Sequence, residues 1–225
     1  MKKIMVTLMF LSLVLCIFAV NEVALLSVAK GRVELNREGK LFKFKTGELL
    51  KHNDELRTGG ESFAAFKYID GSSTIKVFSN SVVKVQASAS GKSLVKRVVV
   101  NKGSVFSQIK PKSGTFMVQT PTTVASVKGT AFLTKLTEDK QSLFIVTEGE
   151  VMLKILDDTA LKSVTSGKTA VVEADGRYVI RLSTPEDLSE LEQTEIEASQ
   201  ELENRIMRIP VLDPAGHLKY IEITH

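Results

Sequence analysis

The residues that could perform acid–base or nucleophilic chemistry in this 225-residue chain are few and scattered. The three histidines, His52, His217 and His225, lie far apart and lack the spacing of metal ligands. The single cysteine, Cys16, excludes an intrachain disulfide, a CxxC redox pair and a thiolate zinc cage. We therefore predict no catalytic residue, no metal site and no cofactor.

Two short segments could still suggest hydrolytic chemistry. His52 precedes Asp54 by two residues, but no third group orients the two, and a solvated pair before a strand is the favoured interpretation. Ser79-Asn80-Ser81 is interpreted in the same way, as polar turn residues. Because no triad and no phosphate-binding loop can be assembled, we predict that the protein is not an enzyme.

The amino terminus predicts export across a membrane. Two lysines lead into an apolar run from Ile4 to Val20, which is the pattern of a secretory leader. Residues 1–20 are either a cleaved signal peptide or a retained anchor, and lipidation at Cys16 is disfavoured because Leu15 stands where a small residue is expected. Either alternative places the rest of the chain outside the cytoplasm, in the periplasm or attached to the envelope.

Charge is unevenly distributed along the chain. The formal net charge is +4, yet it is unevenly divided. Residues 21–183 hold 25 basic and 16 acidic side chains, whereas residues 184–208 hold two basic and eight acidic side chains. Solvated faces that partly neutralise one another explain this pattern, but a basic body could also attract phospholipid headgroups or an anionic cell-wall polymer. Nucleic acid is disfavoured by the leader and by the lack of a basic run with interleaved aromatic residues.

Residues 25–183 are predicted to form an all-β domain. Thirteen of the 14 glycines lie between Gly31 and Gly176, close to the turn spacing of all-β proteins. Asp70-Gly71 indicates a hairpin, since glycine accepts the positive φ of such turns. The β-branched and aromatic runs expected as strands include Ser62–Tyr68, Thr74–Phe78, Val82–Val85 and Val98–Val100.

An internal repeat refines this prediction. The motif Val-x-x-Gly-x-Val surrounds Gly31, Gly103 and Gly149, and a looser copy surrounds Gly167. Each copy puts a turn glycine between two β-branched residues that are expected to face inward. We therefore predict a solenoid-like stack of short strands rather than one closed barrel, although the irregular spacing excludes a strict solenoid.

The apolar period changes after residue 183. Thr184-Pro185-Glu186-Asp187 predicts a helix N-terminus with acids in the first turn. We expect an acidic amphipathic helix over 184–208, ended by Pro210, and a β-hairpin over 209–225. The helix is interpreted as a cap packed across the β body, and a partner-docking helix is the alternative. Its mostly apolar stripe comprises Leu188, Leu191, Glu195, Ala198, Leu202 and Ile206.

Several segments resemble the FecR domain family, over roughly residues 25–175. Asp54-Glu-Leu-Arg-Thr58 and Asp70-Gly-Ser-Ser-Thr-Ile75 are similar to its "G-D-x-I-x-T … D-G-S-x-x-x-L" opening. The segment from Val118 to Phe132 is similar to its "V-x-T-P-x-A-x-A-V-R-G-T-x-F" signature, and later Gly-containing segments to its closing part. The residues that carry the resemblance are Asp70, Gly71, Ser72, Thr120, Pro121, Val127, Gly129, Thr130, Phe132, Gly149 and Gly167.

The resemblance implies an extracytoplasmic, β-rich, solenoid-like fold in which these residues shape the backbone. Pro121 would fix φ and hold Thr120 extended, and Gly129 would permit a tight turn. It implies no catalytic role. FecR-type iron-transport regulators carry a cytoplasmic anti-sigma segment before the membrane span, whereas here only residues 1–3 could lie inside, so signalling would run through another protein.

Two functions follow as expectations. The first is a non-catalytic envelope protein that binds another envelope protein as a sensor, adaptor or scaffold. The alternative is a binding module for an anionic cell-wall or membrane-surface polymer, motivated by the basic body.

Overall fold

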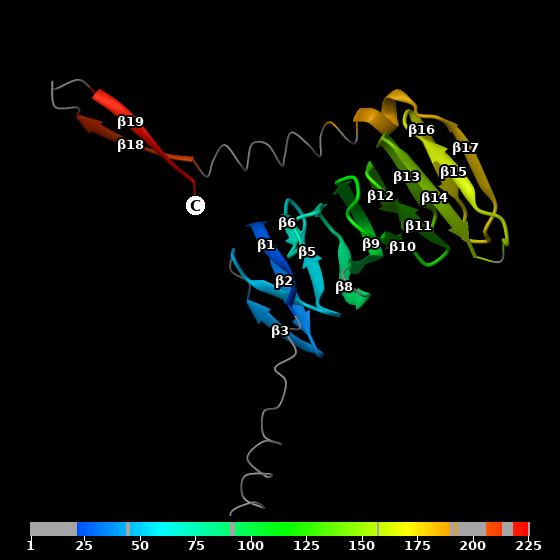
Figure 1. Ribbon diagram of the computed structural model, residues 1–225, viewed down its shortest axis with the longest axis horizontal. Helices are drawn as coiled ribbons and strands as arrows, with labels where there is room; N and C mark the ends of the chain where they lie inside the picture. The colour runs from blue at the N-terminus through cyan, green and yellow to red at the C-terminus, as the bar shows by residue number, and fades with distance from the viewer. Residues whose placement is uncertain are drawn as a thin grey trace, which may run out of the picture.

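The chain is almost entirely β-strand in its computed structural model, which describes residues 22–43, 46–90, 93–156, 158–189, 192, 206–212 and 218–224 (Figure 1). Strands β1–β17 belong to one mixed hydrogen-bonded sheet, whose parallel pair is β9 with β10. A separate two-stranded antiparallel sheet follows near the carboxyl end. The prediction of an all-β body is confirmed.

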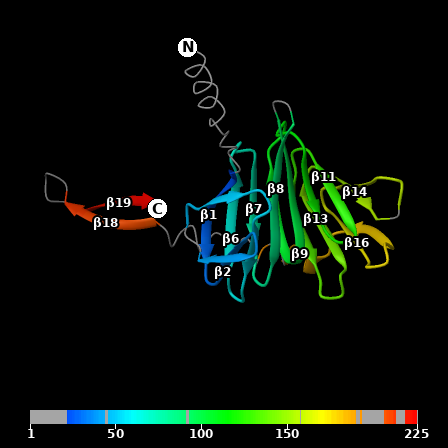
Figure 2. The same cartoon turned by 90° about the horizontal axis from the view of Figure 1, so that it is seen from below.

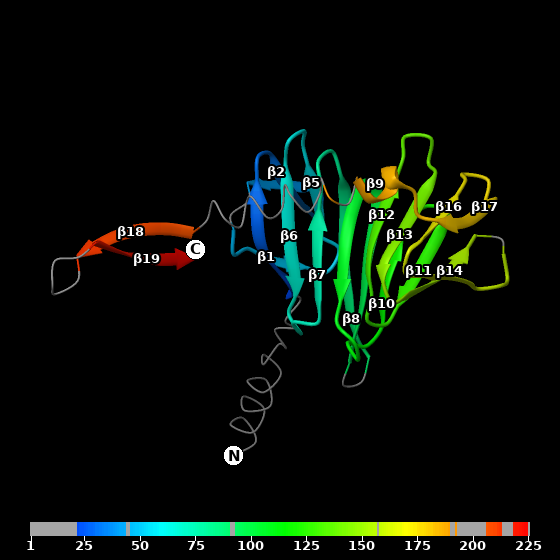
Figure 3. The ribbon, with the colours of Figure 1, turned by 90° about the horizontal axis from the view of Figure 1, so that it is seen from above.

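The large sheet lies in two layers, which are joined by the long strand β9 (Ser93–Ile109). The strands of each layer run side by side in Figures 2 and 3. Sheet A contains, in spatial order, β4 (Leu49–Lys51), β1 (Glu22–Lys30), β6 (Phe63–Tyr68), β7 (Ser73–Val77), the second half of β9, β12 (Ala131–Leu136), β13 (Ser142–Glu148), β16 (Lys168–Val172) and β17 (Tyr178–Leu182). Sheet B contains β3 (Lys40–Lys43), β2 (Val33–Arg37), β5 (Glu55–Thr58), β8 (Val82–Ser90), the first half of β9, β10 (Phe116–Gln119), β11 (Thr123–Val127), β14 (Glu150–Ile155) and β15 (Lys162–Thr165).

The main core fills the space between the two layers. Successive side chains of a strand point to opposite faces, so the alternating burial along β7 and β11 places every second residue in this core. The rings of Phe66, Tyr68 and Phe116 pack edge to face, with centroids 5.8 and 6.0 Å apart. A second, smaller cluster on sheet A consists of Val28, Phe63, Ala65, Phe78, Phe106, Ala131, Leu133 and Ile145.

The Val-x-x-Gly-x-Val repeats mark corners at which the chain passes from one layer to the other. Gly31 and Gly149 lie between a strand of sheet A and a strand of sheet B, and Gly103 is the point at which β9 crosses over. All three have φ between 68° and 77°. The repeat therefore encodes layer crossings, whereas the solenoid-like stack stays a prediction because the strand order shows only an open mixed sheet.

The predicted strands and the first hairpin are found at their expected places. The four runs lie in β6, β7, β8 and β9. The hairpin between β6 and β7 is closed by the amide of Gly71, which donates to the Tyr68 carbonyl at 2.8 Å. The domain begins slightly before the predicted boundary, at Glu22 in β1.

A short helix begins at Pro185, as predicted, and residues 185–189 and 192 are helical. The Asp187 amide donates to Thr184 Oγ1 at 3.3 Å, and the Thr184 amide donates to Asp187 Oδ2 at 2.8 Å, which forms a reciprocal cap. Residues 193–205 of the expected helix lie outside the described residues.

The hairpin near the carboxyl end is longer than predicted. It pairs β18 (Ile206–Leu212) with β19 (Leu218–Thr224), and it stands apart from the two layers in Figure 1. The expectation that the helix extends to residue 208 and is ended by Pro210 is wrong, because residues 206–208 are already strand and Pro210 lies inside β18 opposite Tyr220.

The expected leader at residues 1–20, with Cys16, lies outside the described part of the chain. Within the described part, no helix has the length and apolar character needed to cross a membrane.

Candidate functional site

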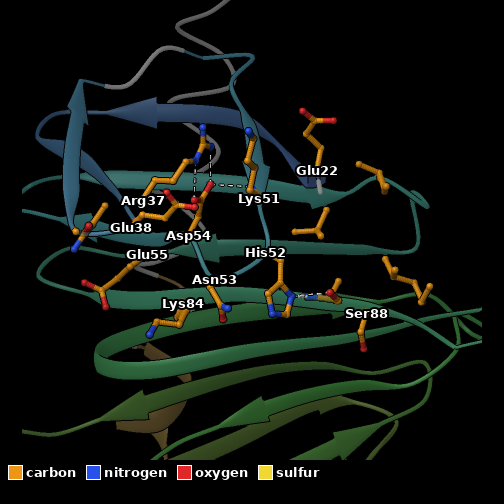
Figure 4. Close-up of a pocket in the computed structure, with 17 residues that line it drawn as sticks. Glu22, Arg37, Glu38, Lys51, His52, Asn53, Asp54, Glu55, Lys84 and Ser88 are labelled. Atoms are coloured by element: carbon orange, nitrogen blue, oxygen red, sulfur yellow. Dashed lines mark hydrogen bonds and ion pairs between the residues drawn. The ribbon is translucent and has the colours of Figure 1, made fainter. Parts of the chain in front are cut away.

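An open pocket of about 800 Å³ lies at one end of the two layers, beside β2, the β4–β5 connection and β8 (Figure 4). It contains the histidine and aspartate that the sequence offered for acid–base chemistry. Its charged lining combines four acidic with three basic side chains, so no strong field of one sign develops there. These residues are Glu22, Glu38, Asp54 and Glu55, and Arg37, Lys51 and Lys84.

Asp54 is committed to a structural ion pair. Its side chain is only 1% exposed, and Arg37 binds it through two hydrogen bonds, Nε to Oδ1 at 2.9 Å and Nη2 to Oδ2 at 2.7 Å. The amide of Lys51 donates to the same Oδ2 at 2.7 Å. The hydrogen bond to Asp54 raises the pKa of Arg37. Both carboxylate oxygens thus tie β2 to the β4–β5 connection, and the expectation of a solvated Asp54 is wrong.

His52 binds a different partner. Its Nδ1 lies 2.7 Å from the Ala87 carbonyl oxygen and 3.2 Å from the Ala87 amide nitrogen, both in β8. Beside it, Asn53 adopts a φ of 70° and its Oδ1 accepts a hydrogen bond from Gln86 Nε2 at 2.7 Å. Figure 4 shows His52 directed toward β8 and Asp54 toward Arg37. The two side chains therefore hold a turn in place instead of forming the solvated pair that was expected, and they do not form an acid–base pair.

The predicted motif residues Asp70, Gly71 and Ser72 meet a buried lysine. Lys96 in β9 is fully buried, and its Nζ lies 2.5 Å from Asp70 Oδ2 and 2.5 Å from Ser72 Oγ. It also donates to the Ser113 carbonyl at 2.6 Å. Burial raises the pKa of Asp70, but hydrogen bonds from Lys96 and Ser72 outweigh it and leave this pKa below its ordinary value.

Lys96 was not singled out in the sequence. The signal was available, because Lys96, Val98 and Val100 alternate with more exposed residues and therefore face the core together. Tyr68 is buried nearby, and its hydroxyl lies 3.1 Å from the Arg97 carbonyl oxygen, to which it donates. Burial raises the pKa of this phenol, and the charge of Asp70 adds to the effect. The Asp-Gly-Ser motif thus closes one end of the core.

Thr120 and Pro121 form the turn between β10 and β11. The Thr120 amide donates to the Thr123 carbonyl at 2.9 Å, while Pro121 is exposed. Thr120 and Ser142 are buried, and Ser142 Oγ donates to Thr120 Oγ1 at 2.8 Å. This hydroxyl contact joins sheet B to sheet A, so the Thr-Pro motif fixes the relation of the two layers.

The remaining motif residues gather mostly at one corner. Val127 and Phe132 belong to the core, and Thr130 exchanges backbone hydrogen bonds with Ile109 at 2.8 and 3.1 Å. Gly129 and Gly149 face each other there, since a Cβ on Gly149 would lie 2.6 Å from the Gly129 carbonyl oxygen.

Gly167 lies at a separate turn between β15 and β16, where its amide donates to the Val146 carbonyl at 2.9 Å. It is not part of the Gly129–Gly149 corner. The motif residues therefore lie at four places: the Lys96 end, the β10–β11 turn, the Gly129–Gly149 corner and the Gly167 turn.

Comparison with known proteins finds a family match over part of the chain. Residues 54–152 match the family described as FecR protein. This chain carries a FecR domain. None of the curated proteins matches the chain.

Two crystal structures of a "putative anti-sigma factor" from Parabacteroides distasonis, at 1.65 and 2.50 Å resolution, share the fold. The first is 16% identical with a TM-score of 0.51 over 76% of this chain and 84% of that one. The second is also 16% identical with a TM-score of 0.51, over 75% and 83%. At this identity the likeness concerns the fold alone.

The FecR domain presents a broad outer face on sheet B. Its hydrogen-bond register aligns two rows of side chains across the strands, most of them half-buried. The rows mix aliphatic and cationic groups, and beyond Lys84 the register continues to the carboxylate Glu55 of β5. The first row is Lys84, Val99, Gln119, Val124 and Lys154, and the second is Gln86, Arg97, Met117, Ser126 and Met152.

Metal binding finds no support in the part of the chain that is described, where no three His, Cys, Asp or Glu side chains gather as ligands. The charged side chains buried in the FecR domain are bound to each other instead. The outer face of sheet B is therefore a second candidate surface for a ligand, beside the pocket at the end of the layers.

Proposed function

We propose that this protein is a non-catalytic, extracytoplasmic FecR-domain protein that binds another envelope protein and acts as a sensor, adaptor or scaffold. The observation that carries the proposal is the outer face of sheet B, called here the B face: Lys84, Arg97, Val99, Met117, Val124, Met152 and Lys154. Lys84 and Lys154 lie at the two ends of the first row, and Arg97 lies among the apolar side chains beside Met117, a mixture found in protein interfaces.

The chemistry of the polar groups supports a binding role. Asp54 is bound by Arg37, and Lys96 is bound by Asp70 and Ser72, so these groups stabilise turns. The structural relatives bear the name of an anti-sigma factor, a class that acts by binding a protein. Export is supported by the basic and apolar leader pattern of residues 1–20.

The B face predicts the chemistry of the partner. Arg97 lies beside Met117, with Nη2 4.0 Å from Sδ, so a cation and a polarizable apolar group share one contact point. A partner surface with apolar centre and carboxylates at its margin would fit this arrangement, because complementary charge guides encounter and fixes orientation.

The test is crosslinking of the full chain in intact cells, followed by identification of what is captured. We expect one defined envelope protein, and we expect the double variant Arg97→Glu/Lys154→Glu to reduce its recovery about tenfold, equivalent to about 1.4 kcal/mol. The matched control is Lys112→Glu/Lys140→Glu, which reverses two exposed turn lysines outside the B face. Equal losses in both variants, or a consistently solitary protein, would contradict the proposal.

The alternative is a module for an anionic cell-wall or membrane-surface polymer, favoured by the cations of the B face and by the excess of basic residues in 21–183. Co-sedimentation with cell wall or with anionic vesicles distinguishes it. Such binding should weaken strongly between about 0.1 M and 1 M salt, as the screening length falls from about 10 to 3 Å. No binding at low salt would eliminate this alternative.

A further inference from the structure

Strand β17 forms one end of sheet A and has an open edge. In the described part of the chain it pairs with β16, and Figure 3 shows it at the end of the layers opposite from β1. The Ser183 amide, just after β17, donates to the Gly167 carbonyl at 2.9 Å on the β16 side. Because backbone groups alternate in direction along an antiparallel strand, the N–H and C=O groups of Tyr178, Ile180 and Leu182 point away from β16. Such an edge is a template for a further strand.

The other three end strands of the two layers carry lysines. Strand β3 begins with Lys40 and ends with Lys43, β4 ends with Lys51, and β15 begins with Lys162. Lysines on an edge strand, and short edge strands, are means by which proteins prevent edge pairing. Strand β17 is longer than these three strands and contains no lysine.

The charged side chain of β17 is already bound. Arg181 donates to Asp187 through Nη1 at 2.5 Å and through Nη2 at 3.2 Å, on the outer face of sheet A. Its Nη1 also donates to the Leu182 carbonyl at 3.1 Å, and that oxygen retains a second lone pair for another donor. The guanidinium group is therefore not a free charge that would repel an approaching strand.

Apolar side chains are exposed along the same edge. Leu182 is 75% and Tyr178 is 42% exposed, although both lie on the inner side of sheet A with Ile180, which packs against the main core. Sheet B ends here at β15, and Lys162 Nζ lies 5.2 Å from the centre of the Tyr178 ring. The core is thus open at this end, and exposed apolar groups beside an open edge mark an interaction site.

We propose that β17 pairs antiparallel with β17 of a second copy of this chain, about a two-fold axis at Ile180. Sheet A then continues from one copy into the other. The proposal goes beyond the function proposed above, and none of the B-face residues takes part in it.

The edge is complementary to itself in this register. The two Ile180 residues lie opposite each other, and Tyr178 lies opposite Leu182 of the second copy. The donors and acceptors of these residues meet in hydrogen-bonded pairs, and their side chains cover apolar surface that is exposed in a single copy. Val179 lies opposite Arg181, so no like charges meet. A two-fold axis uses the same patch on both copies and closes the assembly at two.

Neighbouring registers fit less well. An axis at Arg181 would place two guanidinium groups opposite each other, which is unfavourable. An axis at Val179 would place Leu182 opposite Gly176, which has no side chain to cover it. The charge and the apolar pattern of the strand therefore select Ile180 as the centre.

Exchange of charge across the axis tests the proposal. Sedimentation of the full chain in mild detergent should show an equilibrium between monomer and dimer. In Tyr178→Lys/Leu182→Lys, lysines face each other across the axis, and the dissociation constant should rise about tenfold or more. In Tyr178→Lys/Leu182→Glu, each lysine faces a glutamate, and the constant should return toward that of the natural chain.

The two double variants form a matched pair. Within one copy, residues 178 and 182 are about 13 Å apart along the strand, so the new charges meet only across the axis. Leu41→Lys, on an exposed residue of β3 at the opposite end of the layers, is the control and should leave the constant unchanged. Equal constants in both double variants, or a monomer at every concentration, would overturn the proposal.

Single cysteines in a Cys16→Ser background test the register. Ile180→Cys lies opposite its own copy with Cα atoms about 5.5 Å apart, so mild oxidation should give a disulfide-linked dimer. Leu182→Cys lies about 14 Å from its copy and should not be linked, although it is more exposed. Melting of each reduced variant verifies that the fold is intact.

Other results would assign the contact elsewhere. Linked dimers of Leu182→Cys without those of Ile180→Cys would show a different register. Linked dimers of Leu41→Cys alone would place the contact at the opposite end of the layers. Capture of another protein by Ile180→Cys in intact cells, without a linked dimer, would assign the edge to a strand of that protein. Each of these results would overturn the proposal.

Discussion

Lys96 illustrates how a charged residue becomes part of a core. Its stem lies in phase with Val98 and Val100, and its ammonium group reaches Asp70, Ser72 and the Ser113 carbonyl at the end of the layers. These three acceptors replace the water that burial removes from the ammonium group. A lone buried cation would lack such acceptors. In this chain, Asp70 and Ser72 of the Asp-Gly-Ser motif bind that ammonium group.

We expect Lys96→Met to lower the free energy of unfolding by about 1–3 kcal/mol, below the 3–5 kcal/mol of a fully buried pair, because Asp70 remains partly hydrated. Asp70→Asn should cost less in the Lys96→Met background than alone, since it no longer strands a buried cation. Urea unfolding of the four chains measures this coupling. Additive costs would contradict it. The exposed pair of Arg177 and Asp175 is the control, and Arg177→Met should leave the unfolding midpoint unchanged.

At the scale of elements, the corners explain why the same short motif recurs. A chain that leaves one layer for the other must turn sharply, and a glycine with positive φ permits such a turn. Corners also pack against each other: a Cβ on Gly103 would lie 2.7 Å from the Ser81 Cα of the adjacent corner. Backbone approach this close admits no side chain.

Gly149 and Gly167 allow the cost of a positive φ to be separated from the cost of a close backbone approach. Both have positive φ, 75° and 80°, but only Gly149 has a neighbour within 4 Å of an added Cβ. We expect Gly167→Ala to cost about 1 kcal/mol, from the left-handed backbone alone. Gly149→Ala should cost a further 1–3 kcal/mol, because the Gly129 carbonyl and Thr130 must move. Thermal unfolding of both variants measures the difference, and equal costs would show that the corner can relax freely.

The whole molecule is two layers with two differently used outer faces. The B face carries cations and half-buried apolar groups, whereas the outer face of sheet A buries Leu133, Ile145 and Thr169, the last of which donates a hydrogen bond to Asp187.

Protonation of the Asp187 carboxylate should lower the stability of the molecule at acidic pH. Burial raises its pKa, but Arg181, the Thr184 amide and Thr169 outweigh this and lower it from 3.8 to about 2. A carboxylate with a lowered pKa stabilises the fold above pH 4 and loses that contribution as the pH falls toward 2. The melting temperature should therefore fall more steeply between pH 4 and pH 2 in the natural chain than in Asp187→Asn. Parallel pH profiles would contradict this assignment.

Local rules made much of the fold predictable. Strand alternation, the turn glycines, the Asp70-Gly71 hairpin and the Thr184-Pro185 helix start depend on neighbouring residues, so their patterns are written in short segments of sequence. The limits of the helix were less predictable, because the residues after 205 satisfy both a helical stripe and strand alternation, and pairing of β18 with β19 decides between them.

The sequence by itself determined a β body with glycine corners, a leader pattern, and the motif residues of the FecR domain. Only the tertiary structure decided that Asp54 pairs with Arg37 rather than His52, that Lys96 is buried, and that a second apolar cluster forms on the outer face of sheet A. The reason is physical: cross-strand register brings together residues far apart in the chain, and burial then decides which charges must be paired.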